Sequence, residues 1–261
     1  MATELILSPY EGLATLYDSD RNRPFYQSVA AKLVQAAQKS SDDPKEKGSN
    51  QTWLDLGCGT GLSLLEFRSA WPDARWLGVD ASSAMLHQAR QKPELRGVHW
   101  ISARAEHLPL PDACLDGVTS SFALHWFPEV AWNEIARVLK PGGRFLGSAP
   151  LLGRGLGASG NRALARELLR ARPGRSLAQG YRLEQLRERF AGGAWELQSL
   201  TEIQENEVFA NAQAWQETLI SRGAWQASLG QGTAPELPLT SAPIDFSWKI
   251  GLFLARKATK T

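Results

Sequence analysis

The stretch Trp53-Leu54-Asp55-Leu56-Gly57-Cys58-Gly59-Thr60-Gly61 decides the fold of this 261-residue chain. Short apolar residues run directly into a glycine-rich turn, and residues 62–68 are compatible with a helix. Glycine in such a turn allows positive φ and lets a ligand approach the backbone closely. The first amide groups of the following helix then face that ligand. This order predicts a ligand site at a helix N-terminus, although a merely tight turn would show the same pattern.

Two aspartates narrow the kind of ligand. Asp55 lies just before the glycines, where a carboxylate can order the turn and reach the ammonium group of a ligand through water. Asp80 follows 25 residues later at the end of a predicted strand, placed to accept hydrogen bonds from both hydroxyls of a ribose. Its alternative role is to cap the next helix. Nicotinamide dinucleotide enzymes favour G-x-G-x-x-G, whereas the third glycine here comes one residue early.

Predicted strands and helices alternate from residue 52 onward. Strands are expected at 52–56, 75–80, 98–102, 115–120 and 144–148, and helices at 61–70, after Ser82 or Ser83, and at 128–140. A strand at 194–209, a helix at 211–222 and a strand at 246–256 follow. We therefore expect an α/β fold, a Rossmann-like, doubly wound, mostly parallel seven-stranded sheet with the ligand at the carboxyl ends of its strands.

The remaining segments predict how the chain is divided. Residues 1–50 are expected to form an N-terminal lid, with a loop and a short helix in 1–20 and a longer helix at 24–39. Residues 51–261 are expected to form the ligand-binding domain. Within that domain, 150–192 is predicted to be a basic helical insertion after strand five, with helices at about 160–171 and 182–190.

Four motifs together resemble the class I S-adenosylmethionine-dependent methyltransferases: residues 55–61, 78–86, 105–112 and 139–143. The resemblance implies that S-adenosylmethionine is the cofactor. The residues that it implies as cofactor-binding are Asp55, Gly57, Cys58, Gly59, Gly61, Asp80, Ala81, Met85, Arg104, Ala105, Ser120 and Ser121. Among these, the glycines would line the methionine moiety, Asp80 would bind ribose, and Ala81 and Met85 would flank adenine. The chain departs from the family at Arg104, where an aspartate that contacts the adenine amino group is common.

Candidate catalytic residues come from two other stretches. Residues 120–127 follow strand four, and in this family they face the transferable methyl group. His125 could serve there as a general base, as a polar wall or as a packed core histidine, and many methyl transfers need no base. Tyr17, together with Tyr10, could close a lid over the cofactor or simply pack between helices. Cys58 is better interpreted as a small packing residue than as a nucleophile.

Composition excludes several classes of protein. The net charge of +2 shows no global bias toward nucleic acid, and no Asn-Pro-Pro-Tyr type motif follows strand four. Two cysteines cannot build a disulfide framework, which suits a reducing compartment. The first residues lack a signal peptide pattern, and no apolar stretch is long enough for a membrane span. We expect a cytoplasmic protein without a metal site.

A second, looser resemblance concerns the molecule that accepts the methyl group. Tyr17-Asp18, the stretch from Ser120 or Ser121 to Trp126, and the late strand-helix-strand are similar to the malonyl-acyl-carrier-protein O-methyltransferases of biotin synthesis. Nine arginines against three acidic residues between 154 and 189 could dock an acidic acyl carrier protein, or could be solvated helix faces. The alternatives are a small-molecule acceptor, such as a carboxylic acid or an aromatic natural product, and a cofactor-binding regulatory module without catalysis.

Overall fold

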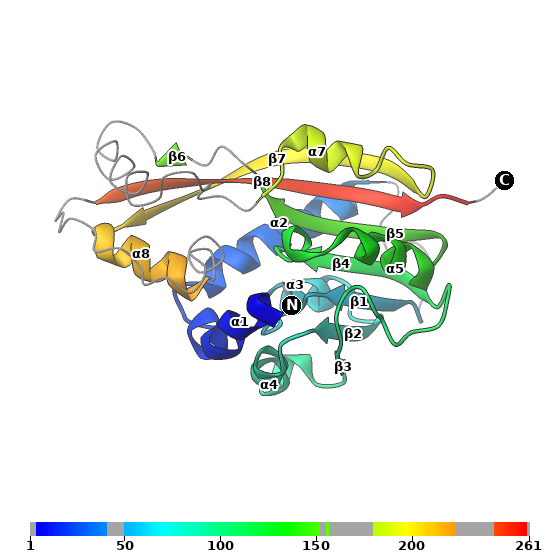
Figure 1. Cartoon of the computed structure of the whole chain (residues 1–261), viewed down its shortest axis with the longest axis horizontal. Helices are drawn as coiled ribbons and strands as arrows, with labels where there is room; N and C mark the ends of the chain where they lie inside the picture. The colour runs from blue at the N-terminus through cyan, green and yellow to red at the C-terminus, as the bar shows by residue number, and fades with distance from the viewer. Residues whose placement is uncertain (1–3, 41–49, 152–154, 157–179, 223–242, 260–261) are drawn as a thin grey trace.

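The computed structural model describes residues 4–40, 50–151, 155–156, 180–222 and 243–259 (Figure 1). Its centre is one sheet, in which the strands pair in the order β3-β2-β1-β4-β5-β8. Strand β8 also pairs with the short β6 and with β7. The strands are β1 (Thr52–Leu56), β2 (Arg75–Asp80), β3 (His99–Ser102), β4 (Leu115–Ser121), β5 (Leu139–Pro150), β6 (Gly155–Leu156), β7 (Trp195–Phe209) and β8 (Ile244–Lys257). The first five are parallel, and β8 runs antiparallel to its neighbours. The seven predicted strands are confirmed, and the two-residue β6 is an addition.

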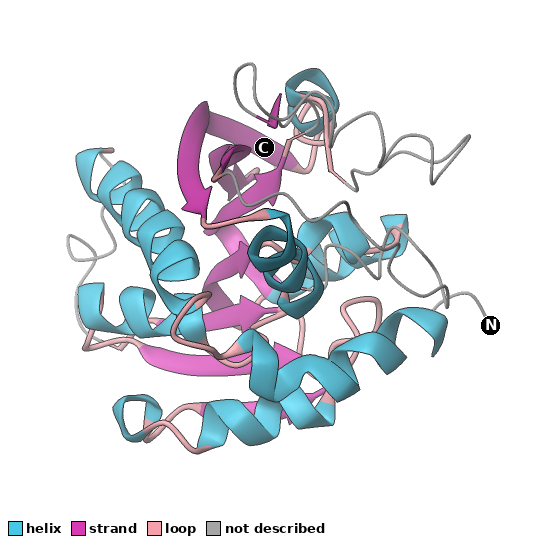
Figure 2. Ribbon diagram, turned by 90° about the vertical axis from the view of Figure 1, so that its left-hand side faces the viewer, coloured by secondary structure: helices cyan, strands magenta, loops and turns pink. Residues whose placement is uncertain are grey.

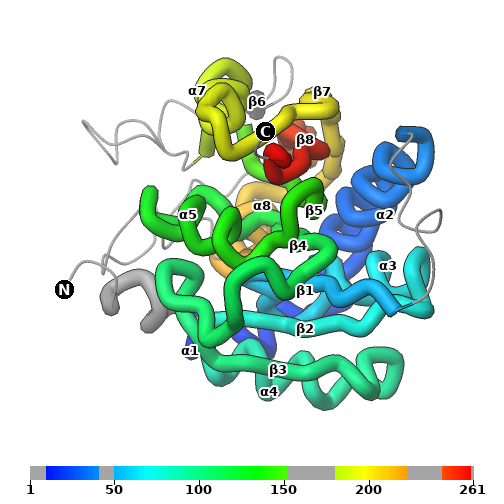
Figure 3. Tube along the Cα trace, turned by 90° about the vertical axis from the view of Figure 1, so that its right-hand side faces the viewer, coloured from blue at the N-terminus to red at the C-terminus, as the bar shows by residue number. Residues whose placement is uncertain are grey.

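Helices cover both faces of this sheet (Figure 2). The helices are α1 (Glu4–Tyr17), α2 (Arg23–Lys39), α3 (Leu62–Ala70), α4 (Ser83–Arg90), α5 (Glu129–Val138), α7 (Leu183–Glu188) and α8 (Ala212–Ser221). Apolar side chains of α2, α3 and α8 share one core, and those of α5 and α7 share a second core. Figure 3 shows α2 and α3 on one side of the strands and α5 on the other. This is the doubly wound arrangement that the alternating pattern predicts.

Central strand β1 explains how the site acquires a rigid base. Trp53, Leu54 and Leu56 are almost completely buried, as expected for a parallel strand covered on both faces. Trp53 faces the core beneath α3 and stacks on Trp71, with ring centroids 5.4 Å apart. Leu54 and Leu56 face the opposite core. The glycine turn therefore follows directly on β1, a strand whose position is fixed by packing on both faces.

Three element boundaries differ from the sequence expectation. Residues 4–17 form the single helix α1, where a loop and a short helix were expected. Helix α5 ends at Val138, and Leu139 already pairs with Leu115 of β4. The Pro141-Gly142-Gly143 stretch is consequently an irregularity inside β5, where the register with β4 shifts.

Other boundaries agree with the expectation. Helices at 24–39 and 182–190 correspond to α2 and α7, and Ser82 caps α4 by accepting a hydrogen bond from the Met85 amide (3.2 Å). The expected helix at 160–171 lies outside the described residues. Among the described helices, none is long and apolar enough to cross a membrane.

Candidate functional site

A cavity opens at the carboxyl ends of β1, β2 and β4, where the doubly wound sheet predicts a ligand. Its volume is about 860 Å³ when the open mouth is included. Nine of the predicted site residues line it: Tyr17, Gly57, Gly59, Asp80, Ala81, Met85, Arg104, Ala105 and Ser121. Residues from five separate stretches of sequence therefore meet at one place.

The glycine turn is bonded to the end of β2. The amides of Gly57 and Cys58 both donate to the Val79 carbonyl, at 2.8 and 3.0 Å. Gly57 has a φ of 69°, and a Cβ there would lie 2.3 Å from the Ala123 Cβ. A side chain at this position would therefore be strained by its backbone conformation and would also collide with the opposite wall of the cavity.

Asp80 has the geometry for a vicinal diol. Its Oδ2 accepts a hydrogen bond from the Gly59 amide (2.7 Å), and its Oδ1 accepts one from the Ser82 amide (2.9 Å). Each carboxylate oxygen keeps a further lone pair, and the residue lines the cavity. Burial raises the pKa of Asp80, while the backbone amides counteract that rise. The alternative role also holds in part, because Oδ1 binds at the start of α4.

Asp55 and Ser120 do not line the cavity. Asp55 lies opposite Thr119 in the pairing of β1 with β4, so its Oδ1 accepts a hydrogen bond from the Thr119 hydroxyl (2.8 Å). Its Oδ2 is buried and accepts no hydrogen bond from the described residues. Ser120 is fully buried and donates its hydroxyl to the Leu56 carbonyl (2.9 Å). Both side chains join the strands beneath the cavity.

Cys58, Gly61 and His125 also lie outside the cavity wall. Burial raises the pKa of the Cys58 thiol well above its usual value, so the thiol stays protonated and packs as a small side chain. Gly61 caps α3 with a φ of 81° and faces Leu95 instead of the ligand space. In the short 3₁₀ turn Leu124–Trp126, the neighbouring Trp126 lines the cavity in place of His125.

Comparison with known proteins identifies the central part of the chain. Residues 54–147 match the family described as methyltransferase domain. This stretch is a class I methyltransferase domain. Its cofactor is S-adenosylmethionine. Because the match covers the glycine turn, Asp80 and the strands beneath the cavity, the family assignment and the geometry concern the same residues.

Proteins similar to this methyltransferase domain include methyltransferases that are named for different acceptors. The Malonyl-[acyl-carrier protein] O-methyltransferase of Alcanivorax borkumensis is 45% identical over 102 residues, which are 38% of this chain and 35% of that protein. The Demethylmenaquinone methyltransferase of Thermus thermophilus is 42% identical over 97 residues, 36% of this chain and 44% of that protein. The chain thus spans less than half the length of these curated relatives. Among solved structures, the YcgJ protein of Bacillus subtilis covers 89% of this chain and 100% of its own, with a TM-score of 0.57 and 23% identity.

One end of the cavity is lined by apolar side chains. Met85 and Ala105 are buried and line the cavity, and Ala81 lies beside them. At the edge, the Arg104 Nε donates to the Glu106 Oε1 at 2.6 Å. Arg104 therefore does not leave the edge cationic, because Glu106, which also lines the cavity, compensates its charge.

Helix α1 covers the aromatic end of the cavity. Tyr10 packs edge-on against Trp126, with ring centroids 5.8 Å apart, and Tyr17 stacks on Tyr26 at 4.9 Å. Burial raises the pKa of Tyr10 and of Tyr17 well above the usual value of 10, so both hydroxyls remain protonated at neutral pH. This end of the cavity is therefore aromatic, and its two tyrosine side chains are uncharged.

Two polar contacts that sequence reasoning missed attach α1 to the domain. The Glu11 carboxylate accepts from the Ser83 and Ala84 amides (2.8 and 3.2 Å) at the N-terminus of α4. Lys92 forms an ion pair with Asp18 and donates to the Thr60 carbonyl (2.7 Å) in the glycine turn. The partners are more than 30 residues apart in the chain, so no local pattern in the sequence could have paired them.

Proposed function

We propose that this chain uses S-adenosylmethionine to methylate the free carboxylate of malonyl-acyl-carrier protein, the esterification step that the names of several relatives describe. Relatives called Malonyl-[acyl-carrier protein] O-methyltransferase share 45%, 44% and 35% identity with it over their matched parts. A further relative is the Biotin biosynthesis bifunctional protein of Teredinibacter turnerae, 37% identical over 106 residues. These likenesses support the acceptor, and the chemistry of the cavity supports it independently.

The residues of the cavity fit the cofactor. Asp80 would accept the two ribose hydroxyls, Met85 and Ala105 would enclose adenine, and Gly57 and Gly59 would let the methionine moiety approach the backbone. When bound, S-adenosylmethionine supplies a methyl group on a positively charged sulfur, already activated for transfer. What remains for this chain is to align the acceptor with that methyl group and to exclude water.

The observation that carries the acceptor proposal is the composition of the aromatic end. Its described lining consists of Tyr10, Tyr17 and residues 121–123 and 126–128. Both tyrosines hold their protons, and none of these side chains can act as a general base near pH 7. An acceptor that must lose a proton would find no base there among the described residues. A carboxylate is already ionised at pH 7, and the protonated Tyr10 hydroxyl could donate a hydrogen bond to it.

Docking of an acidic carrier on the Arg-rich stretch 154–189 is part of the proposal. Arg154, Arg162, Arg166, Arg170, Arg172 and Arg175 lie outside the described residues. Of the other three, Arg189 pairs with Glu129, whereas Arg182 and Arg187 are exposed and have no ion-pair partner among the described residues. Exposed, uncompensated arginines are the type of surface that steers an acidic partner.

The test is transfer to malonyl-acyl-carrier protein, followed by intact mass. We expect a gain of one methylene with the malonyl carrier and none with the acetyl carrier, which lacks the free carboxylate. Reversing the charge at Arg182 and Arg187 should raise KM for the malonyl carrier and leave binding of S-adenosylhomocysteine unchanged. Methylation of the acetyl carrier, or no methylation of the malonyl carrier by a protein that binds S-adenosylhomocysteine, would contradict the proposed acceptor.

A small molecule is the second candidate acceptor, and the aromatic end of the cavity favours it. The rings of Tyr10, Trp126 and Phe127 would suit a flat apolar substrate. Free malonate, other small carboxylic acids and aromatic hydroxyl compounds belong in the same assay. Turnover of one of these without turnover of the malonyl carrier would establish this alternative. Cofactor binding without transfer to any acceptor would instead indicate a regulatory module.

A further inference from the structure

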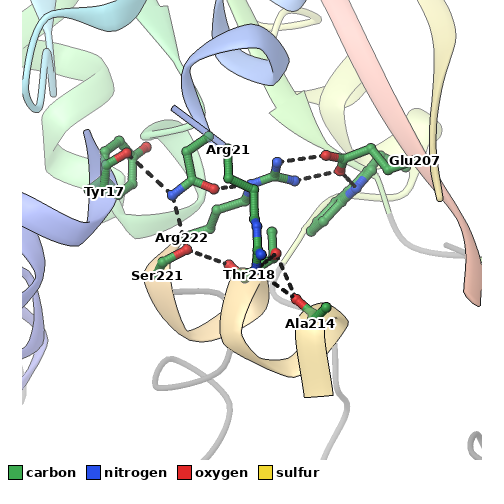
Figure 4. Close-up of polar contacts among 9 residues, drawn as sticks. Tyr17, Arg21, Glu207, Ala214, Thr218, Ser221 and Arg222 are labelled. Atoms are coloured by element: carbon green, nitrogen blue, oxygen red, sulfur yellow. Dashed lines mark hydrogen bonds and ion pairs between the residues drawn. The ribbon is translucent and has the colours of Figure 1, made fainter. Parts of the chain in front are cut away.

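A buried polar cluster joins the turn after α1 to the C-terminal strands, outside the cofactor cavity. We call it the Arg222 cluster; it comprises Asn22, Glu207, Ser221, Arg222 and Trp248. The side chain of Arg222 is only 2% exposed. Its two terminal nitrogens donate to the two oxygens of Glu207, at 2.6 and 2.8 Å (Figure 4). The Trp248 indole also donates to Glu207, at 2.6 Å, so this carboxylate is held by two elements.

Asn22 connects this cluster to α1. It is completely buried, and its Oδ1 accepts from the Arg222 Nε at 2.9 Å. Its Nδ2 donates to the carbonyls of Leu16 and Tyr17, at 3.2 and 3.3 Å, and to the Ser221 hydroxyl at 3.0 Å. The last carbonyls of a helix have no partner within the helix. Asn22 therefore links the last carbonyls of α1 to Ser221 and Arg222, which lie about 200 residues later in the chain.

Stability alone does not explain such a cluster. Burying an ion pair costs desolvation free energy that its attraction barely offsets, and apolar residues of similar size often give equal stability. What fully bonded polar groups do supply is one defined arrangement. The Arg222 guanidinium also lies 4.1 Å from the centre of the Phe25 ring, which fixes the first turn of α2 against it. The cluster thus fixes both helices that flank the turn at residues 18–22.

The residue held most directly by this arrangement belongs to the cavity. Tyr17 is the last residue of α1, its carbonyl is bonded to Asn22, and its ring lines the cavity. A Cβ added to Gly59 would lie 4.0 Å from the Tyr17 ring, which shows how close the ring is to the glycine turn. No described residue of β7 or α8 lines the cavity, yet both elements reach it through Asn22 and Tyr17.

We propose that Asn22 and Arg222 are positioning residues for the cofactor site, and that they act by holding Tyr17 against the glycine turn. The C-terminal elements β7 and α8 would then set cofactor affinity without touching the cofactor. The inference rests on the proposed function only in that the cavity takes S-adenosylmethionine; it is independent of the acceptor.

The test measures the affinity of S-adenosylhomocysteine by calorimetry in a double-mutant cycle. Asn22→Ala should weaken binding about tenfold, the equivalent of one hydrogen-bonded contact at the site. Tyr17→Ala should weaken it as well, and the double variant should bind no more weakly than Tyr17→Ala alone. A general loss of structure would instead make the two effects add. Glu207→Gln, which keeps the shape of the side chain, repeats the measurement should Asn22→Ala fail to fold, with the same expected absence of additivity.

Arg21→Ala is the matched control. Arg21 also links the turn to α8, by donating to the Ala214 carbonyl and the Thr218 hydroxyl (3.2 and 3.3 Å), but its side chain is half exposed and forms no hydrogen bond with the Arg222 cluster. We expect the Arg21→Ala variant to bind S-adenosylhomocysteine with the affinity of the wild type. Wild-type affinity in Asn22→Ala or Glu207→Gln, or additive effects with Tyr17→Ala, would overturn the inference alone. No binding by the wild-type protein would overturn the proposed function with it.

Discussion

The two aspartates near the glycine turn, Asp55 and Asp80, have different surroundings, and these surroundings give them different roles. Asp80 is bonded by two backbone amides and faces the cavity, so it remains available to a ligand. Asp55 is more deeply buried, with 1% of the residue exposed, does not line the cavity and has one hydrogen bond from a hydroxyl. Burial raises the pKa of Asp55 to about 7, the Thr119 hydrogen bond lowers it, and the nearby Asp80 charge raises it again. Asp55 therefore titrates close to neutral pH.

Titration of Asp55 should make stability depend on pH. Its pKa is raised from 3.8 in the unfolded chain to about 7 in the folded protein, so the folded state holds the proton more tightly. The contribution of Asp55 to the free energy of unfolding is therefore constant below about pH 4, falls as the pH rises toward 7, and is lowest above pH 7. Asp55→Asn should abolish this slope and be the more stable protein above pH 7. Urea midpoints from pH 4 to pH 8 check this, and parallel curves for the two proteins would contradict it.

Glu106 is expected to recognise the adenine amino group in place of the usual aspartate, with Arg104 orienting it. The reason is that Oε1 accepts from Arg104 while Oε2 accepts no hydrogen bond from the described residues. Glu106→Gln should weaken S-adenosylhomocysteine binding about tenfold. It should leave the weak binding of S-inosylhomocysteine, whose ring carries an oxygen there, unchanged or improved.

The control for Glu106 is Asp80→Ala, which should weaken both nucleosides equally because they share the ribose. If Glu106→Gln also weakens the two ligands to the same extent, Glu106 does not read the base.

At the scale of elements, helix α1 behaves as part of the cavity wall because three polar contacts attach it. Glu11 meets the N-terminus of α4, Asp18 meets Lys92, and Asn22 meets Arg222. The Glu11 contact is favourable for a second reason, since the positive end of the helix dipole attracts a carboxylate. The exposed position of Glu11 limits that contribution in salt.

Removing the Glu11 contact should loosen α1 without unfolding the domain. We expect Glu11→Ala to speed hydrogen exchange of the α1 amides severalfold and to leave those of β1 and β4 unchanged, because the lost contact contributes on the order of 1 kcal/mol. Asp20→Ala is the matched control, since Asp20 is an exposed acidic residue of the adjoining turn with no ion-pair partner among the described residues. Equal exchange of α1 in wild type, Glu11→Ala and Asp20→Ala would show that the Glu11 contact does not hold α1.

At the scale of the whole molecule, the features that could be predicted from the sequence are those set by residues close together in the chain. Strands of the sheet, the glycine turn and the Ser82 cap were predictable because each depends on neighbouring residues. Helix α1 was not, because Pro9 and Gly12 break a helical pattern locally while contacts with α4 and the aromatic residues stabilise it. The inward position of Asp55 depends on its register with Thr119, and register is a property of two strands.

Strand β8 has a consequence for the order in which the chain can fold. It lies between β5 and β7, yet it follows both in the sequence. During synthesis, residues 144–150 and 195–209 emerge as strands whose shared partner does not yet exist. Until residues 244–257 leave the ribosome, β5 presents an open edge, and open edges are sites of mispairing and aggregation. The nascent protein should therefore depend on chaperones longest in the interval between β7 and β8.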